Sequence, residues 1–164
     1  MQINVDVITK AQVQLDQTIQ TKHHVTYQSV YDELKLALIV ELGELANEVK
    51  CFKFWSVKGP SDRHVILEEY VDGIHFIGSL SIAHKVDTIY EIPDHIQLLD
   101  KKSLTKRFNE LFLMMDTLNK PSGIKRWYQE YLVLGYQLGF KIDDIINGYF
   151  AKNKINFDRQ ANNY

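Results

Sequence analysis

The stretch SDRHVILEEYVDGIHFIGSLSIAHK, residues 61–85, decides how this chain folds. Apolar side chains occupy most sides of the helix that it predicts, from Val65 to Ile82. A helix that is apolar nearly all round is buried in the centre of a domain. Ser61 carries a hydroxyl that can cap the first turn. The stretch therefore predicts a central, buried helix.

Helical patterns continue on both sides of this segment. Apolar spacing predicts helices over 4–20, 29–54, 103–118, 121–139 and 143–160, with loop and short helix over 86–103. Ser29 is the expected N-cap of 29–54, and Gly139 is the expected C-terminal glycine of 121–139. Only three prolines and eight glycines interrupt the chain. We therefore expect one all-α domain over residues 1–164, an antiparallel bundle of about five to six helices.

Composition and charge exclude several classes of protein. The chain has 45% apolar and 24% charged residues and a net charge of −2, as is typical of a soluble globular protein without a general attraction to nucleic acid. No run approaches the roughly 20 apolar residues of a membrane span. Cys51 is the single cysteine and cannot form an intramolecular disulfide. We expect a cytoplasmic protein that binds neither nucleic acid nor membrane.

Two pairs of acids carry the chemistry. Glu41 and Glu44 lie three residues apart on one predicted helix, and Glu69 and Asp72 repeat the spacing on the next. Residues three apart share a helix face, and helices joined by a short loop pack antiparallel, so we expect the two pairs to meet. Carboxylates without thiols or several histidines suit Mg²⁺, with Mn²⁺ as the alternative. Such a site suggests a polyphosphate ligand.

Other uses of these acids stay open at this point. A single pair at this spacing is more often a solvated helix face, and we place Glu48 and Glu68 at the surface or behind the ligands. A di-iron bundle needs Glu-x-x-His on two helices, whereas only Asp72-x-x-His75 comes close here. We therefore expect His75 to pack in the interior or behind the ligands.

The order of the motifs resembles the all-α dimeric dUTPases, a branch of the MazG-like all-α NTP pyrophosphatases. The two acidic pairs are shared across that superfamily, and three further segments narrow the resemblance. They are QVQLD over 12–16, CFKFWSVK over 51–58, and the C-terminal run from Tyr149 to Tyr164 that contains Lys152, Asn156 and Arg159. The family usually has Asn at the position of Asp16 and Gly at that of Asn163. The joint match spans residues 12–164.

The resemblance implies a reaction in which water attacks the α-phosphorus of dUTP and gives dUMP and pyrophosphate. Glu41, Glu44, Glu69 and Asp72 would hold more than one Mg²⁺ ion, and clustered metals neutralise phosphate oxygens and activate water. We expect Glu44 to take the proton of the water. The resemblance also implies a homodimer.

The resemblance implies contacts with the substrate as well. Lys152 and Arg159 are expected to bind phosphate oxygens, because seven residues are about two helical turns and place both on one side. Lys58 is a weaker candidate for the same role. The residues expected to bind the nucleoside are Gln12, Asp16, Trp55, Asn156 and Tyr164. The alternative is that Lys152 and Arg159 are surface charges, Trp55 a core residue and Gln12 a surface residue.

Two other functions compete with the dUTPase. One is a MazG-like pyrophosphohydrolase that acts on dCTP or on a damaged nucleotide. The other is a non-catalytic helical adaptor that binds another protein, with the acids as surface residues. If the protein is phage-encoded, a regulatory protein partner is a further expectation.

Overall fold

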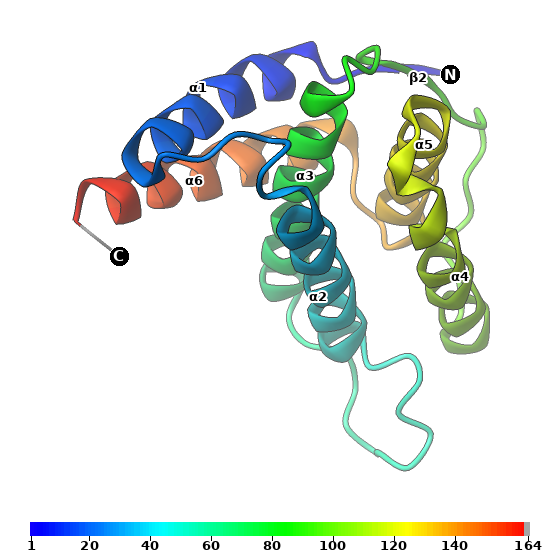
Figure 1. Cartoon of the computed structure of the whole chain (residues 1–164). Coiled ribbons are helices and arrows are strands. Elements are labelled where there is room, and N and C mark those ends of the chain that lie inside the picture. The colour runs from blue at the N-terminus through cyan, green and yellow to red at the C-terminus, as the bar shows by residue number, and fades with distance from the viewer. Residues whose placement is uncertain (163–164) are drawn as a thin grey trace.

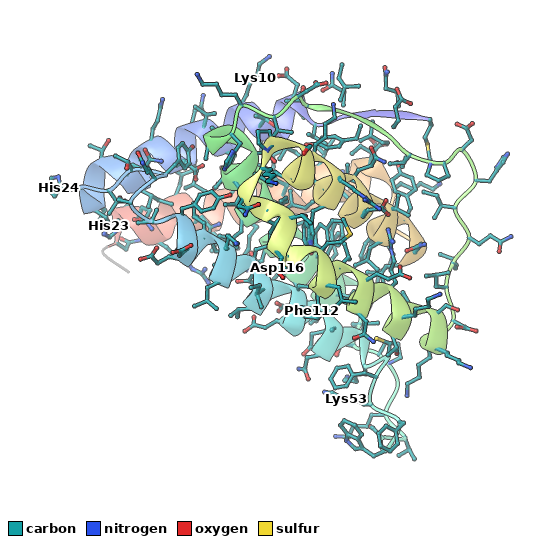
Figure 2. All side chains as sticks on the ribbon, turned by 45° about the vertical axis from the view of Figure 1, so that its right-hand side comes forward. Lys10, His23, His24, Lys53, Phe112 and Asp116 are labelled. Atoms are coloured by element: carbon teal, nitrogen blue, oxygen red, sulfur yellow. The ribbon has the colours of Figure 1, made fainter. Side chains whose placement is uncertain are left out.

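The computed structural model describes residues 1–162 of the chain and is mainly helical (Figure 1). The helices are α1 (Asp6–His23), α2 (Tyr31–Val49), α3 (Arg63–Ala83), α4 (Lys101–Leu113), the 3₁₀ helix η1 (Met114–Asn119), α5 (Pro121–Gln137) and α6 (Ile142–Ala161). The structure confirms the all-α class and the helical bundle. Side chains cover the ribbon throughout, and the segment with Lys53 projects from one end (Figure 2).

Helix α3 is the centre of this arrangement. It packs against α2 along its length and also contacts α6, α1 and α5. Helices α1 and α6 lie side by side and both cross α3 (Figure 1). Its residues from Tyr70 to Ser81 are almost all buried, as the apolar pattern predicts. The acids of α3 therefore lie where side chains of neighbouring helices can reach them.

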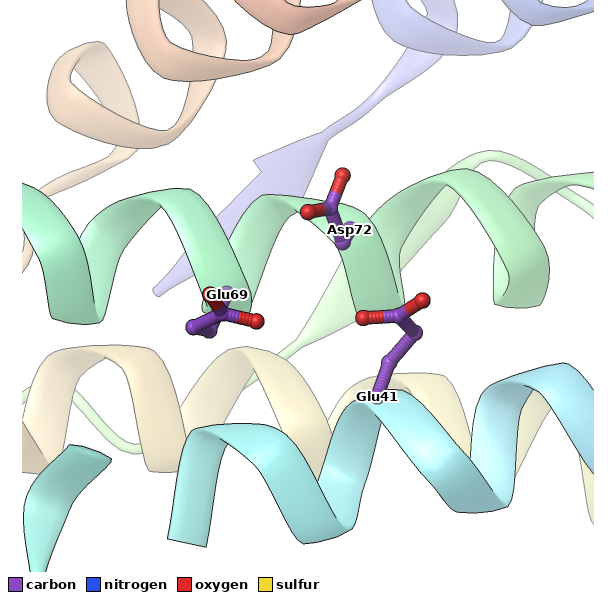
Figure 3. A group of neighbouring side chains, drawn as sticks. All are labelled: Glu41, Glu69 and Asp72. Atoms are coloured by element: carbon purple, nitrogen blue, oxygen red, sulfur yellow. The ribbon is translucent and has the colours of Figure 1, made fainter. Parts of the chain in front are cut away.

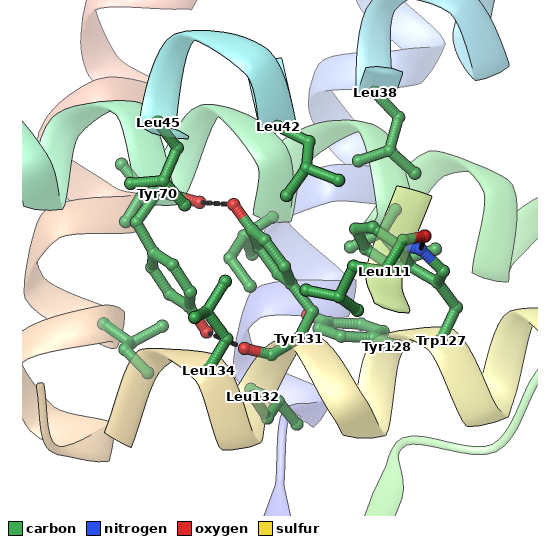
Figure 4. Close-up of a cluster of buried hydrophobic side chains, with 14 of the residues drawn as sticks. Leu38, Leu42, Leu45, Tyr70, Leu111, Trp127, Tyr128, Tyr131, Leu132 and Leu134 are labelled. Carbon is green, nitrogen blue, oxygen red and sulfur yellow. Dashed lines mark hydrogen bonds between the residues drawn. The ribbon is translucent and has the colours of Figure 1, made fainter. Parts of the chain in front are cut away.

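A pair of tyrosines fixes α3 against α5. The rings of Tyr70 and Tyr131 stack with their centroids 4.6 Å apart, and each hydroxyl donates to the backbone carbonyl of the other residue at 3.0 Å (Figure 4). Both hydroxyls are fully buried and need such partners. Leu42 and Leu45 of α2 are buried in the same cluster. Because Tyr70 follows Glu69 directly, this pair also sets the face of α3 that carries the acids.

A small sheet departs from the sequence prediction. Strands β1 (Gln2–Asn4) and β2 (Ile89–Glu91) pair antiparallel, with Ile3 opposite Tyr90. The expectation of loop and short helix over 86–103 is therefore wrong for residues 89–91. Three-residue strands carry too little alternation to be recognised, and the two partners lie far apart in the chain.

The start and end of α2 also differ from the prediction. Ser29 does not cap the helix, because its hydroxyl bonds to the backbone of Thr26 and the N-cap position is Val30. The helix ends at Val49 rather than near residue 54, because Lys50 adopts a left-handed backbone with φ of 55°. Residues 51–62 are consequently loop and turn.

The observed ends of α3, α4 and α5 agree with the sequence prediction in part. Ser61 does not cap α3, whose N-cap residue is Asp62, and its hydroxyl contacts Glu48 and Lys50 instead. Helix α4 begins two residues earlier than predicted, where Asp100 accepts a hydrogen bond from the Ser103 amide at 2.7 Å. Gly139 follows α5 with φ of 90°, which confirms its role at the helix end.

Candidate active site

Three carboxylates from α2 and α3 converge. Glu41 of α2 faces Glu69 and Asp72 of α3 (Figure 3), and one oxygen from each lies within 4.8 Å of the others. The spacing of three residues brings Glu69 and Asp72 to the same side of α3, and the tight packing of α2 on α3 supplies Glu41. The structure thus brings together three of the four acids that the sequence selected.

The fourth acid lies at the rim. Glu44 is exposed and outside the compact group, yet its charge contributes to the raised pKa of Glu41 and of Glu69. Glu48 accepts a hydrogen bond from Ser61, whereas Glu68 pairs with Lys152, which also contacts Asp72 of the three-acid group.

The cluster is electrostatically strained. Burial raises the pKa of Glu41 to about 7, and the charges of Asp72, Glu44 and Glu69 add to the effect. Burial is also the main cause that raises the pKa of Glu69, and the charges of Asp72 and Glu44 raise it further. Burial raises the pKa of Asp72, although Lys152 opposes it. Acids held this close repel one another, and a cation between them relieves that repulsion.

A lysine of α6 reaches this cluster. Lys152 Nζ lies 2.7 Å from Oδ2 of Asp72 and 3.0 Å from Oε1 of Glu68, and only 11% of its side chain is exposed. These two acids raise the pKa of the ammonium although burial lowers it, so it stays protonated. Lys152 is thus a partly buried cation beside the acids rather than a surface charge.

A cavity of about 290 Å³ is bounded by α1, α3, α6 and the loop before α2. Gln12 and Asp16 line it from α1, and Asn156 and Arg159 line it from α6. The charge of Arg159 lowers the pKa of Asp72, which links this wall to the acid cluster. Four of the predicted substrate-binding residues therefore meet at one cavity.

Gln12 uses all of its hydrogen-bonding capacity inside the protein. Its Nε2 donates to Asp16 Oδ1 at 2.8 Å and to Ser79 Oγ at 3.1 Å. Its Oε1 accepts from the Tyr149 hydroxyl at 2.8 Å and lies 2.8 Å from His75 Nδ1. An amide has two donor hydrogens and two acceptor lone pairs, so this set is complete. Gln12 is 2% exposed and is not a surface residue.

His75 is a buried, neutral member of the same network. Its ring stacks on Tyr149 with centroids 4.3 Å apart, and burial lowers its pKa to about 3. Because Gln12 Oε1 can only accept, His75 Nδ1 carries the ring hydrogen. This placement agrees with the expectation that His75 packs in the interior.

The sequence analysis missed Tyr27 and Ser79, which line the cavity and hold Asp16. The Tyr27 hydroxyl donates to Asp16 Oδ2 at 2.8 Å, and the Ser79 hydroxyl donates to Oδ1 at 3.0 Å. Ser79 follows His75 by one helical turn, which is a usable signal on a buried helix. Tyr27 lies in a loop, and no local pattern predicts its contact.

Two of the predicted residues, Trp55 and Lys58, are not brought to this cavity. Trp55 is 64% exposed in the loop after α2, where it contacts Phe52 and Phe54 edge to face. Lys58, in the same loop, lines a different cavity with Cys51 and Leu104. Tyr164 lies outside the described residues.

A comparison with known families agrees with this geometry. A family model described as dUTPase matches residues 4–164, which include the acid pairs, the cavity and the C-terminal run. The chain belongs to this family, the all-α dimeric dUTPases. A comparison with curated proteins gives no match. Within the described part of the chain, none of the helices has the length and apolar character needed to cross a membrane.

Proposed function

We propose that this protein is a dUTP diphosphatase, which hydrolyses dUTP to dUMP and pyrophosphate with Mg²⁺ and accepts Mn²⁺ as a substitute. The observation that carries the proposal is the convergence of Glu41, Glu69 and Asp72 within 4.8 Å, beside a cavity of nucleoside size. The family match supports the same activity. Family membership favours it over a pyrophosphohydrolase for damaged nucleotides and over a non-catalytic adaptor.

The acids form the metal site. Glu41, Glu69 and Asp72 present oxygen atoms without thiols, which is the donor set that Mg²⁺ prefers. Glu44, at the rim, completes the site for more than one ion. Bound Mg²⁺ would neutralise charge on the phosphate oxygens and lower the pKa of the attacking water.

Glu44 takes the proton from that water. Its exposed position leaves it free of the contacts that hold Asp72, and it is close enough to shift the pKa of Glu41. The water oxygen forms a bond to the α-phosphorus while the bond to the bridging oxygen of pyrophosphate breaks. A nearby carboxylate within reach of the water is suited to this step.

Lys152 and Arg159 bind the triphosphate. Lys152 of α6 holds its ammonium beside the acid cluster, 2.7 Å from Asp72 Oδ2 and 3.0 Å from Glu68 Oε1, and would bind a phosphate oxygen if Mg²⁺ took over Asp72. Arg159 can bind two oxygens at once. Lys58 is a further phosphate ligand only if its loop moves, because it now lines another cavity.

The nucleoside occupies the cavity. Asp16 and Asn156 line it, and Gln12 supports the wall through its hydrogen bonds. Trp55 and Tyr164 are proposed to cover the base and sugar when the substrate is bound. The protein acts as a cytoplasmic homodimer without nucleic acid or membrane partners, and a regulatory protein partner is proposed for a phage-encoded chain.

The test measures pyrophosphate release from dUTP with and without Mg²⁺. We expect no turnover in chelator and a loss of about 100-fold or more for Glu69→Gln, since removal of a metal-ligand carboxylate disrupts the site. Glu33→Gln, on an exposed turn of α2, is the matched control and retains activity. Full turnover by Glu69→Gln, or by wild type in chelator, would overturn the proposal.

A further inference from the structure

Asp16 is the one carboxylate that lines the cavity in the described part of the chain. It is 7% exposed and accepts three hydrogen bonds. Gln12 and Ser79 donate to Oδ1, and Tyr27 donates to Oδ2. A carboxylate has about four acceptor sites, so one site on Oδ2 is left. Much of the surrounding wall is apolar, including Phe76.

The hydrogen bonds of Gln12 fix the orientation of the Asp16 carboxylate. Gln12 cannot turn its amide over, because Oε1 is needed by Tyr149 and His75. Its Nε2 therefore always faces Oδ1 of Asp16. The remaining acceptor site on Oδ2 is the one open to a ligand, and it requires an N–H or O–H donor.

Uracil and cytosine both meet that requirement. Uracil offers its ring N3–H, and cytosine offers an N–H of its 4-amino group, which is a usual partner of Asp and Glu. A carboxylate oxygen can accept a hydrogen bond from the amino group of cytosine. A donor at the same place would face the amino hydrogens and form no hydrogen bond with them.

We propose that Asp16 reads the base through this free acceptor site, and that the protein therefore hydrolyses dCTP as well as dUTP. This inference rests on the proposed dUTP diphosphatase function and extends its substrate class to 2′-deoxypyrimidine triphosphates with an N–H on that edge. The reaction is the same. Water adds to the α-phosphorus of dCTP, the bond to pyrophosphate breaks, and dCMP is formed.

The substitution Asp16→Asn is expected to affect the hydrolysis of dUTP and of dCTP differently. Oδ1 must stay an oxygen because Gln12 donates to it, so the new amide nitrogen replaces Oδ2. One of its hydrogens goes to the Tyr27 oxygen and the other points where the acceptor site was. A donor there suits O4 of uracil and opposes the amino group of cytosine. We expect kcat/KM for dCTP to fall about 10- to 100-fold more than kcat/KM for dUTP.

The experiment measures kcat/KM of the Mg²⁺-loaded protein for dUTP and dCTP, in wild type and Asp16→Asn. Wild type is expected to use dCTP within about tenfold of dUTP, a difference of one ordinary hydrogen bond. Asp116→Asn makes the same change of charge on the exposed face of η1 and leaves the ratio unchanged. Thermal unfolding of each variant shows that the compared proteins are folded.

The outcomes are distinct. If wild type hydrolyses dUTP and leaves dCTP essentially untouched, this inference fails and the dUTP diphosphatase stands. If neither nucleotide is hydrolysed, both fail. If Asp16→Asn lowers kcat/KM for dUTP and for dCTP by the same factor, Asp16 only supports the wall of the cavity and the inference fails. The wild-type comparison decides the matter even if the variant does not fold.

Discussion

Lys152 Nζ lies 2.7 Å from Oδ2 of Asp72, so a cation of α6 already sits beside the cluster that is proposed to hold Mg²⁺. The same ammonium pairs with Glu68 at 3.0 Å. In the metal-free protein this contact offsets part of the repulsion among the acids. A metal ion would compete with this ammonium for the carboxylates, and a substrate phosphate would compete with the carboxylates for the ammonium. Lys152 therefore has two roles that mutation can separate.

Lys152→Met keeps the aliphatic stem and removes the charge. We expect Mg²⁺ to bind roughly threefold to tenfold more tightly, because a competing cation of modest strength is lost. We expect kcat/KM for dUTP to fall about 10- to 100-fold, because a charged hydrogen bond to phosphate is lost. Calorimetric titration with Mg²⁺ and steady-state kinetics give the two values.

Lys154→Met is the matched control, since Lys154 is exposed on the same helix. It is expected to change neither value. If Lys152→Met weakens Mg²⁺ binding, the ammonium supports the metal site rather than competes with it, and the assignment to phosphate loses its basis.

The raised pKa of Glu41 predicts how Mg²⁺ binding depends on pH. Its pKa in the folded protein is about 7 against an ordinary 4.5. The folded chain therefore holds a proton that the unfolded chain has lost, so this contribution to stability is full below pH 4.5 and disappears as the pH rises through 7. Mg²⁺ must displace that proton, so we expect its affinity to fall as the pH drops below about 7.

The measurement is thermal unfolding of wild type and Glu41→Gln in chelator between about pH 6.5 and pH 8. Both proteins contain His75, whose unfolded imidazole loses its proton in part of this range and adds an opposite slope, so the difference between the two proteins isolates Glu41. Across this window the melting temperature of wild type should fall relative to that of Glu41→Gln by roughly 2 °C. Mg²⁺ should restore the wild type at the upper pH. An equal slope in both proteins would contradict the role given to Glu41.

The space around two glycines, Gly73 of α3 and Gly43 of α2, predicts opposite effects of an alanine substitution. A Cβ at Gly73 would lie 2.3 Å from the Tyr131 hydroxyl oxygen, which is held by its bond to Tyr70. Gly73→Ala is expected to cost about 1–3 kcal/mol and to lower the melting temperature by roughly 2–12 °C. A Cβ at Gly43 meets nothing within 4 Å, so Gly43→Ala should stabilise α2 by up to about 1 kcal/mol. Equal melting temperatures would show that Tyr131 can move.

The sequence was informative where a pattern repeats along one helix. The apolar residues of 65–82 placed α3 at the centre, and the spacing of Glu69 and Asp72 placed both on one face. Both features depend only on helix geometry. The meeting of Glu41 with this pair followed from the expectation that consecutive helices pack as neighbours, although the connection over 50–62 is longer than the sequence indicated.

Contacts set by tertiary structure were not predictable in this way. Tyr27 reaches Asp16 from a loop, and its partner depends on how α1 is followed by α2. Ser29 and Ser61 have the residue type of an N-cap, yet nearby groups bind their hydroxyls instead. The pairing of Ile3 with Tyr90 joins distant segments. In each case the competing partner is absent from the local sequence.

Trp55 gives the last prediction, because it is exposed although it is proposed to cover the base. The chain has two tryptophans, and Trp127 is fully buried, so collisional quenching of fluorescence by acrylamide reports mainly on Trp55. If the loop that carries Trp55 closes over a nucleotide, or reaches the site of a second copy, a non-hydrolysable dUTP analogue with Mg²⁺ should reduce quenching and shift emission to the blue, since the indole leaves water. Trp55→Phe leaves only Trp127 and should give weak quenching that the analogue does not change. Quenching of the wild type that stays unchanged at saturating analogue, with binding verified by calorimetry, would remove Trp55 from the nucleoside site and leave the base to Asp16 and its neighbours.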